Sequence, residues 1–300
     1  MTQISDVVPS AQGLGIAGHD FRGSPDALAA EFAQLGVDKL DYWPSNRGAL
    51  PLDDYRELLD RHGLTAYTVN QDTSRGRFGA PALERFAADA TRTAIEEAVA
   101  LEAPYVQLYL APPPPERVAE RVDDLARSLT PLAREAEAVG VTLVVENNFD
   151  HRAEDAARVN VARSPQALGE LVEAVGRERL ALAFDPVNFV LCDVDPLAAY
   201  ETLRPYVVNV HLKDCVVLDS VADDGEDRRV LRDGDRRHAR STAVGDGALP
   251  WREILAGLAT EGFDGWLTLD PYCDPEDVHE WSRRSLANIA ALAADKEPTR

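Results

Sequence analysis

Cysteine is scarce in this sequence of 300 residues, which has only Cys192, Cys215 and Cys273 and no CxxC spacing. An odd number of widely spaced cysteines gives no sign of a disulfide framework, so a reducing, cytoplasmic location is expected. No run of 18 apolar residues occurs, which argues against a transmembrane helix. Residues 1–13 lack a basic stretch followed by an apolar one, so no secretory signal peptide is expected.

Basic residues are also few relative to acidic ones. Lys and Arg total 31 against 52 Asp and Glu, which gives a formal net charge of −21. Such a charge repels phosphate groups, so neither nucleic acid nor an anionic membrane surface is expected as a partner. A solvated acidic surface explains the charge without reference to function. With 45% hydrophobic residues, the chain can bury a sizeable core, as one large domain or two smaller ones.

Short apolar segments alternate with amphipathic ones along the whole chain. The apolar segments predict strands at 13–17, 37–43, 64–70, 105–110, 141–145, 180–184, 207–212 and 265–269. The amphipathic segments predict helices at 25–35, 52–62, 82–101, 116–139, 164–175, 196–203, 251–260 and 275–293. Helix boundary signals agree with this division, for example Ser24 before Pro25 at a start and Gly36 at an end.

Eight strands alternating with eight helices are typical of an α/β protein with a parallel sheet. We predict a single (β/α)8 TIM barrel domain over residues 1–300, with an irregular loop at about 215–247. No Pro/Gly/Ser-rich linker divides the chain. A doubly wound open sheet is the alternative, although a GxGxxG turn after the first strand is missing.

Chemically active side chains gather where the later predicted strands end. In the segment 207–214, Asn209, His211 and Lys213 share one face of a strand. Glu146, Asp185 and Asp270 follow three other strands, and in a barrel these ends surround one point at the C-terminal face. Carboxylates that close together need a cation, so a divalent metal is expected, with Mn²⁺, Mg²⁺, Co²⁺ or Zn²⁺ compatible with these donors.

Four short motifs share an order and spacing with a known family. They are Val-Val-Glu-Asn at 144–147, Phe-Asp-Pro-Val-Asn at 184–188, His-Leu-Lys-Asp at 211–214, and Val-Gly-Asp-Gly at 244–247 followed by Trp251. Together they resemble the sugar phosphate isomerase/epimerase family, which has the xylose isomerase-like TIM barrel. The resemblance extends from the first strand to the last, and it specifies the family better than the substrate.

The resemblance implies a divalent ion, Mn²⁺ as the first candidate, held by Glu146, Asp185, His211 and the acid of the last strand, Asp270. In the ketose 3-epimerase branch, the carboxylates after strands five and eight also form the acid/base pair. By that resemblance, Glu146 is the candidate base and Asp270 the acid on the opposite face of the substrate. The metal polarises the substrate carbonyl.

Two departures from the family pattern affect these expectations. Family members usually have Glu where this chain has Asp270, which shortens the reach by on the order of 1 Å, an error that can cost about a hundredfold in rate. Asp270 therefore either binds metal without moving a proton or lies on a closer backbone. The epimerases also commonly have His where this chain has Asn188, so we expect the carbohydrate to be bound differently from a free ketohexose.

Lys213 offers a third catalytic candidate. It either acts directly, as a cationic partner or general acid, or forms a structural salt bridge to Asp214 or Glu146. A direct role makes β-elimination on a 3-keto-glycoside or keto-inositol credible. Further substrate contacts are expected from His19, Trp43, Gln107 and Asn188, with packing roles as the alternative.

The favoured hypothesis is therefore a metal-dependent isomerase or epimerase that removes a proton beside a carbonyl of a sugar, keto-sugar or cyclitol. A lyase or dehydratase on the same barrel is the second reading. An AP endonuclease shares the barrel but conflicts with the acidic charge, and a non-catalytic partner subunit is the fourth possibility. A homo-oligomer is compatible with the sequence, and the arginine-rich section 220–241 is expected to be a lid, an oligomer contact or a solvated loop.

Overall fold

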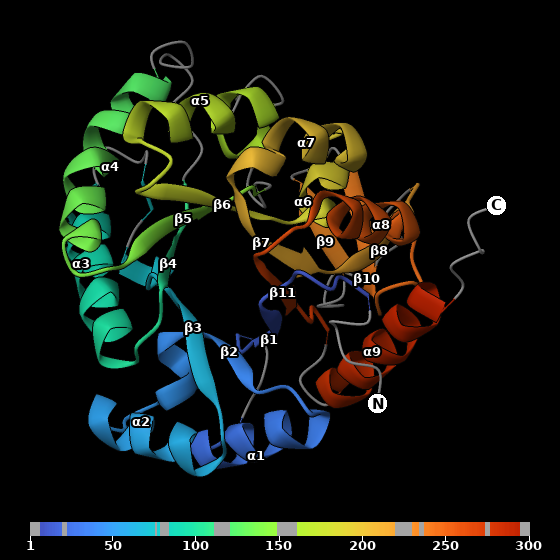
Figure 1. Ribbon diagram of the computed structural model, residues 1–300, viewed down its shortest axis with the longest axis horizontal. Coiled ribbons are helices and arrows are strands. Elements are labelled where there is room, and N and C mark those ends of the chain that lie inside the picture. Colours follow the sequence, from blue (N-terminus) through green and yellow to red (C-terminus); the bar gives the residue numbers. More distant parts are fainter. Residues whose placement is uncertain are drawn as a thin grey trace.

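Branched and aromatic apolar residues fill eight strands that close into a parallel barrel in the computed structural model (Figure 1). The structure describes residues 7–19, 23–75, 77–78, 84–110, 121–148, 161–219, 230–233, 237–273 and 277–294. Neighbouring barrel strands follow the order β1-β11-β7-β6-β5-β4-β3-β2. These strands are β1 (Gly13–Ala17), β2 (Lys39–Tyr42), β3 (Thr65–Asn70), β4 (Tyr105–Leu108), β5 (Thr142–Glu146), β6 (Leu180–Phe184), β7 (Val207–Leu212) and β11 (Trp266–Leu269). The predicted TIM barrel is confirmed.

Amphipathic helices surround the barrel and bury its outer face (Figure 1). They are α1 (Pro25–Leu35), α2 (Leu52–Arg61), α3 (Glu84–Ala100), α4 (Arg121–Glu137), α5 (Pro165–Val175), α6 (Pro186–Leu191), α7 (Pro196–Leu203), α8 (Trp251–Glu261) and α9 (Val278–Ala294). Short 3₁₀ turns lie at Pro44–Arg47, Thr73–Arg75, Val161–Arg163 and Arg204–Tyr206. Residues 111–120, which include the start of the predicted helix 116–139, lie outside the described residues.

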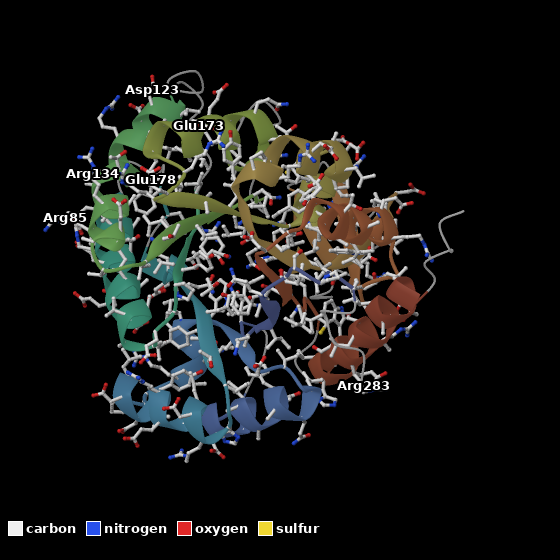
Figure 2. The ribbon with its side chains drawn as sticks, viewed as in Figure 1. Arg85, Asp123, Arg134, Glu173, Glu178 and Arg283 are labelled. Carbon is white, nitrogen blue, oxygen red and sulfur yellow. The ribbon has the colours of Figure 1, made fainter. Side chains whose placement is uncertain are left out.

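Helix ends follow the local sequence signals. The Ser24 side chain accepts a hydrogen bond from the backbone N–H of Ala27, and Gly36 closes α1 in the left-handed conformation with φ 73°. Ser164 caps α5 in the same way, by accepting from Ala167. Charged side chains project from the outer faces of the helices, as Arg85, Asp123 and Arg283 show in Figure 2. Among the described residues, no helix combines the length and apolar character needed to cross a bilayer.

The described parts of the section 215–247 contain regular secondary structure. They form an antiparallel sheet in the order β8-β10-β9, made of β8 (Asp214–Leu218), β9 (Val230–Asp233) and β10 (Arg237–Thr242). The prediction of an irregular loop was therefore wrong for these segments. β10 alternates half-exposed and buried residues, a strand period that its charged composition conceals. Arg237 ties the sheet to α6 by donating to the carbonyl oxygen of Val190 at 3.0 Å.

Aromatic and polar side chains fill the barrel interior. The Tyr67 hydroxyl contacts Thr268, and Thr268 donates to the side-chain oxygen of Asn209 at 2.6 Å. Gly15 faces this layer, where a Cβ atom would lie only 2.3 Å from the Tyr67 ring, so the position requires glycine. Above this layer lie the C-terminal ends of the strands, where TIM barrels place their active sites.

Candidate active site at the C-terminal end of the barrel

A pocket of about 210 Å³ opens where the barrel strands end. Its size is below the range of about 300–1,000 Å³ typical of sites for drug-sized ligands, so it suits a small substrate. The lining residues come from many separate parts of the chain and are mostly polar or aromatic. They are Ala17, His19, Asp41, Trp43, Arg77, Gln107, Tyr109, Glu146, Asn148, Asn188, His211, Lys213, Asp270 and Tyr272.

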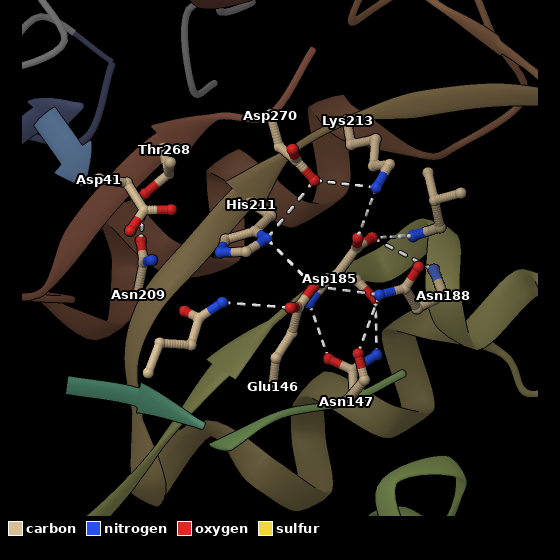
Figure 3. A network of polar contacts seen from close by, with 12 residues as sticks. Asp41, Glu146, Asn147, Asp185, Asn188, Asn209, His211, Lys213, Thr268 and Asp270 are labelled. Atoms are coloured by element: carbon tan, nitrogen blue, oxygen red, sulfur yellow. Dashed lines mark hydrogen bonds and ion pairs between the residues drawn. The ribbon is translucent and has the colours of Figure 1, made fainter. Parts of the chain in front are cut away.

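Glu146, Asp185 and His211 form a buried cluster of potential metal ligands (Figure 3). One donor atom of each lies within 4.8 Å of the others. His211 Nδ1 is 3.3 Å from Glu146 Oε1, and neither ring nitrogen of His211 makes a hydrogen bond. A buried imidazole without a hydrogen-bond partner, beside two carboxylates, is a donor set that fits a divalent cation.

Local backbone structure fixes the two carboxylates of this cluster. Asp185 caps helix α6 through Oδ1, which accepts from the N–H groups of Val187 at 2.8 Å and Asn188 at 3.2 Å. Asn147 joins the two strand ends, since its side chain accepts from the Asp185 N–H at 2.7 Å and donates to the Asp185 carbonyl at 2.8 Å. Asn188 Nδ2 donates to Glu146 Oε1 at 3.2 Å. Asp185 therefore keeps Oδ2 for other partners.

Asp270 lies between two potentially cationic side chains (Figure 3 labels Asp270 and Lys213). Its Oδ1 is 2.7 Å from His19 Nε2, and its Oδ2 accepts from Lys213 Nζ at 2.8 Å. Lys213 also donates to Asp185 Oδ2 at 3.3 Å. The sequence suggested a salt bridge from Lys213 to Asp214 or Glu146. That prediction was wrong, because Lys213 pairs with Asp185 and Asp270 instead. The pairing of two strands explains why Lys213 and Asp270 meet. β11 pairs with β7, and the backbone N–H of Asp270 donates to the carbonyl oxygen of Leu212 at 3.2 Å.

Burial and mutual charge set the protonation of these groups. Burial raises the pKa of Asp185, although Lys213 opposes the rise. Burial would also raise the pKa of Asp270, but Lys213 and His19 hold it well below its usual range. For Lys213, burial disfavours the charge, yet Asp185 and Asp270 keep its pKa well above the ordinary value. Burial likewise opposes a charged His211, whose pKa Glu146 and Asp270 hold well above its ordinary value.

Three carboxylates are buried close together at this end of the barrel. Glu146, Asp185 and Asp270 are all buried, and Lys213 is the lysine that compensates them among the described residues. The closeness of these buried carboxylates is a second feature that favours a divalent cation at Glu146, Asp185 and His211. Asp270 Oδ2 lies 3.6 Å from His211 Nδ1, at the edge of this cluster.

The four residues predicted to contact substrate all line the pocket. Gln107 Oε1, Asn188 Oδ1 and Trp43 Nε1 are buried atoms without a hydrogen-bond partner. His19 packs edge-on against Trp43, with ring centroids 5.4 Å apart. Unpaired buried polar atoms around a cavity are the groups that a polyhydroxylated ligand can satisfy.

Sequence reasoning missed one pocket carboxylate, Asp41. It follows Leu40 on β2, is 1% exposed, and accepts a hydrogen bond from Asn70 Nδ2 at 2.6 Å. Burial raises its pKa to about 7. The available signal was an acidic residue within an apolar strand, between Leu40 and Tyr42.

Two of the four sequence motifs, His-Leu-Lys-Asp and Val-Gly-Asp-Gly, are in direct contact. Asp214, which ends His-Leu-Lys-Asp, is fully buried and accepts from the backbone N–H groups of Gly245 at 2.9 Å and Gly247 at 3.1 Å, both in Val-Gly-Asp-Gly. A Cβ on Gly247 would lie 2.1 Å from Asp214 Oδ1, so this close approach requires glycine. Asp214 thus has a structural role next to Lys213.

Two curated proteins match part of this chain in sequence. The chain is 26% identical to the rhizopine catabolism protein MocC of Rhizobium meliloti over 188 residues, which cover 60% of this chain and 52% of that protein. It is 23% identical to an inosose dehydratase of Lacticaseibacillus casei over 151 residues, covering 50% of this chain and 47% of that protein. The chain thus spans about half the length of the curated relatives it matches.

Solved structures share the fold over nearly the whole chain. A D-tagatose 3-epimerase-like protein superposes with a TM-score of 0.69 at 19% identity, covering 94% of this chain and 98% of that one. The IolI protein with a bound zinc atom superposes with a TM-score of 0.70 at 16% identity, covering 96% and 99%. The sequence model of one family matches residues 26–292. The chain belongs to the xylose isomerase-like TIM barrel family.

Proposed function

We propose that this protein is a divalent-metal-dependent isomerase or epimerase acting beside a carbonyl of a sugar, keto-sugar or cyclitol. The observation that carries the proposal is the convergence of Glu146, Asp185 and His211, whose donor atoms lie within 4.8 Å of one another, beside a small pocket that Glu146 and His211 line. These three residues would hold the ion, with Asp270 as a proposed fourth ligand. When bound there, the ion supplies Lewis-acid polarisation of a carbonyl oxygen.

Glu146 is the proposed general base. Its Oε2 accepts from Gln107 Nε2 at 3.1 Å, and its Oε1 accepts from Asn188, so the carboxylate is held in one orientation. A fixed carboxylate at the wall of a polar pocket can remove a proton from a carbon next to a carbonyl. Gln107 and Asn188 would orient it and, through their unpaired oxygens, accept hydrogen bonds from substrate hydroxyl groups.

Proton return is assigned to the group formed by Lys213, Asp270 and His19. Both oxygens of Asp270 are engaged, by Lys213 Nζ and His19 Nε2, so the proton donors of this group are the amine and the imidazole. A proton delivered from here to the carbon gives an epimer or isomer. The contacts of Asp270 favour a positioning role for it, which accommodates its shorter side chain.

The same group of residues supports one second candidate, a metal-dependent lyase or dehydratase. A cationic Lys213 beside the pocket can protonate a departing hydroxyl group, and the likeness to inosose dehydratase points the same way. The two reactions separate in D₂O with a panel of keto-sugars and inososes. Epimerisation or isomerisation places deuterium in a product that is otherwise an isomer of the substrate, whereas elimination yields a product lighter by one water.

The central test is Glu146→Gln in metal-loaded protein. We expect kcat to fall by about 10²–10⁴-fold, the usual value of a positioned general base. Glu97→Gln is the matched control, because Glu97 is similarly buried at 7% exposure but pairs with Arg47 outside the pocket. Near wild-type kcat in the Glu146→Gln variant would remove Glu146 from the mechanism.

A further inference from the structure

Asp41 is a carboxylate of the pocket to which the proposed reaction gives no role. It belongs to β2, which pairs with β1 and β3, whereas the three clustered metal-ligand candidates belong to β5, β6 and β7. In Figure 3, Asp41 lies on the other side of His211 from Asp185. A ligand that contacts both Asp41 and the cluster would therefore extend across the barrel mouth.

A continuous chain of hydrogen bonds connects Asp41 to the proposed base. Asn70 Nδ2 donates to Asp41 Oδ1 at 2.6 Å, and the Tyr109 hydroxyl donates to Asn70 Oδ1 at 2.7 Å. Gln107 Nε2 then donates to the Tyr109 hydroxyl at 2.8 Å and to Glu146 Oε2 at 3.1 Å. Asp41 and Glu146 are the two ends of this chain, and both receive hydrogen bonds from it.

The direction of the chain is fixed at Asn70. Its Nδ2 also donates to the backbone carbonyl oxygen of Tyr42 at 3.1 Å, and a carbonyl oxygen can only accept. The amide nitrogen of Asn70 therefore faces Asp41, and its oxygen faces Tyr109. Consequently Asp41 Oδ1 accepts a hydrogen bond from Asn70, which fixes the orientation of the Asp41 carboxyl group. Hydrogen bonds of this kind hold the residues of a binding site in place.

The other oxygen of Asp41 has no such partner. Among the described residues, none hydrogen-bonds Asp41 Oδ2, and the side chain lines the pocket. Burial raises the pKa of this carboxyl to about 7, against the opposing effects of His211 and Asn70. Near neutral pH, Oδ2 can accordingly accept a hydrogen bond from a hydroxyl group or donate one to it.

We infer that Asp41 Oδ2 binds a hydroxyl group of the substrate, on the part of the molecule remote from the reacting carbons. Asp41 thereby selects polyhydroxylated keto substrates that carry a hydroxyl group at that position. The inference rests on the proposed function, since it assumes that the reacting carbons lie beside Glu146. A site built to bond a hydroxyl group rejects an analogue that lacks it, because its own buried polar group is left unpaired.

The test combines Asp41→Asn with monodeoxy analogues of an inosose or ketohexose that the manganese-loaded wild-type enzyme converts. We expect the substitution to raise KM about 10- to 100-fold for the full substrate, with kcat changed by less than about threefold. For one deoxy analogue, we expect wild type to show the same rise in KM. The Asp41→Asn variant should show no further rise with that analogue, because both changes remove the same contact and their effects are then not additive. Asp38→Asn, at an exposed carboxylate three positions earlier, is the control and should behave as wild type.

Two results would overturn the inference. One is a KM within twofold of wild type in Asp41→Asn; the other is an equal loss on the full substrate and on every deoxy analogue. If wild type converts none of the ketones, the proposed function fails separately. Calorimetric binding of myo-inositol and its deoxy analogues to both proteins then decides the role of Asp41 by the same comparison, and absence of inositol binding to wild type refutes it.

Discussion

The four hydrogen bonds received by Asp214 allow a quantitative prediction for Asp214→Asn. Asp214 Oδ1 accepts from the N–H groups of Cys215 at 2.8 Å and Leu249 at 3.2 Å, and Oδ2 from Gly245 at 2.9 Å and Gly247 at 3.1 Å. In the asparagine variant, an NH₂ group replaces one oxygen and faces two N–H donors. Two hydrogen bonds to a charged acceptor are lost, each worth about 1.5–3 kcal/mol.

The neutral amide is easier to bury than the carboxylate, since burial itself raises the pKa of Asp214. We therefore expect a net loss of about 3 kcal/mol in the free energy of unfolding. The measurement is the urea midpoint at pH 7, followed by tryptophan fluorescence and circular dichroism. Because Lys213 precedes Asp214 directly, kcat/KM should fall as well, by displacement of Lys213 from Asp270.

Asp246→Asn is the matched control for Asp214→Asn. Asp246 lies in the same Gly-Asp-Gly turn but is exposed, and it contacts Arg284 and Asn288 at the surface. Its replacement should cost less than about 0.5–1 kcal/mol. If Asp214→Asn unfolds within 1 kcal/mol of wild type, its four backbone partners are satisfied in another way, and Asp214 does not join the two motifs energetically.

Three further predictions concern the pocket. Lys213→Met should lower kcat at least 100-fold, because it removes the proposed proton donor. It should also tighten Mn²⁺ binding in calorimetry, because it removes a cation 3.3 Å from Asp185. Unchanged turnover would mean that the role of Lys213 is structural. Adding Mn²⁺ at about 100 times its Kd should stabilise the protein by about 2.7 kcal/mol in thermal melts. His211→Ala should abolish most of this stabilisation. If the variant keeps the full stabilisation, the ion binds elsewhere. In metal-free protein, the raised folded-state pKa of Asp41, about 7 against 3.8, means that its stabilising contribution is full below pH 3.8 and is lost as pH rises through 7. Asp41→Asn should therefore gain stability relative to wild type between pH 4 and 8, by at most about 4 kcal/mol, and a difference that does not change with pH in urea titrations would contradict this.

Much of the site was predictable because it depends on where strands end. Glu146 ends β5, Asp185 follows β6 and His211 is the penultimate residue of β7, and parallel strands bring their carboxyl ends to one edge. Asp41 escaped prediction because an acidic residue in the short β2 does not by itself show whether its side chain points into the barrel or away from it. The partners of Lys213 escaped for a related reason: Asp185 and Asp270 lie 28 and 57 positions away, whereas Asp214 is adjacent in sequence.

By itself, the sequence determined the local elements of this protein. Alternating apolar segments and caps such as Ser24 act over a few residues, so the eight barrel strands and most helices could be assigned from them. Only the tertiary structure decided how β8, β9 and β10 pair and which charges meet in the pocket. Strand pairing and ion pairs depend on register between distant segments, as between His19 and Asp270, 251 positions apart, and that register is set by closure of the barrel.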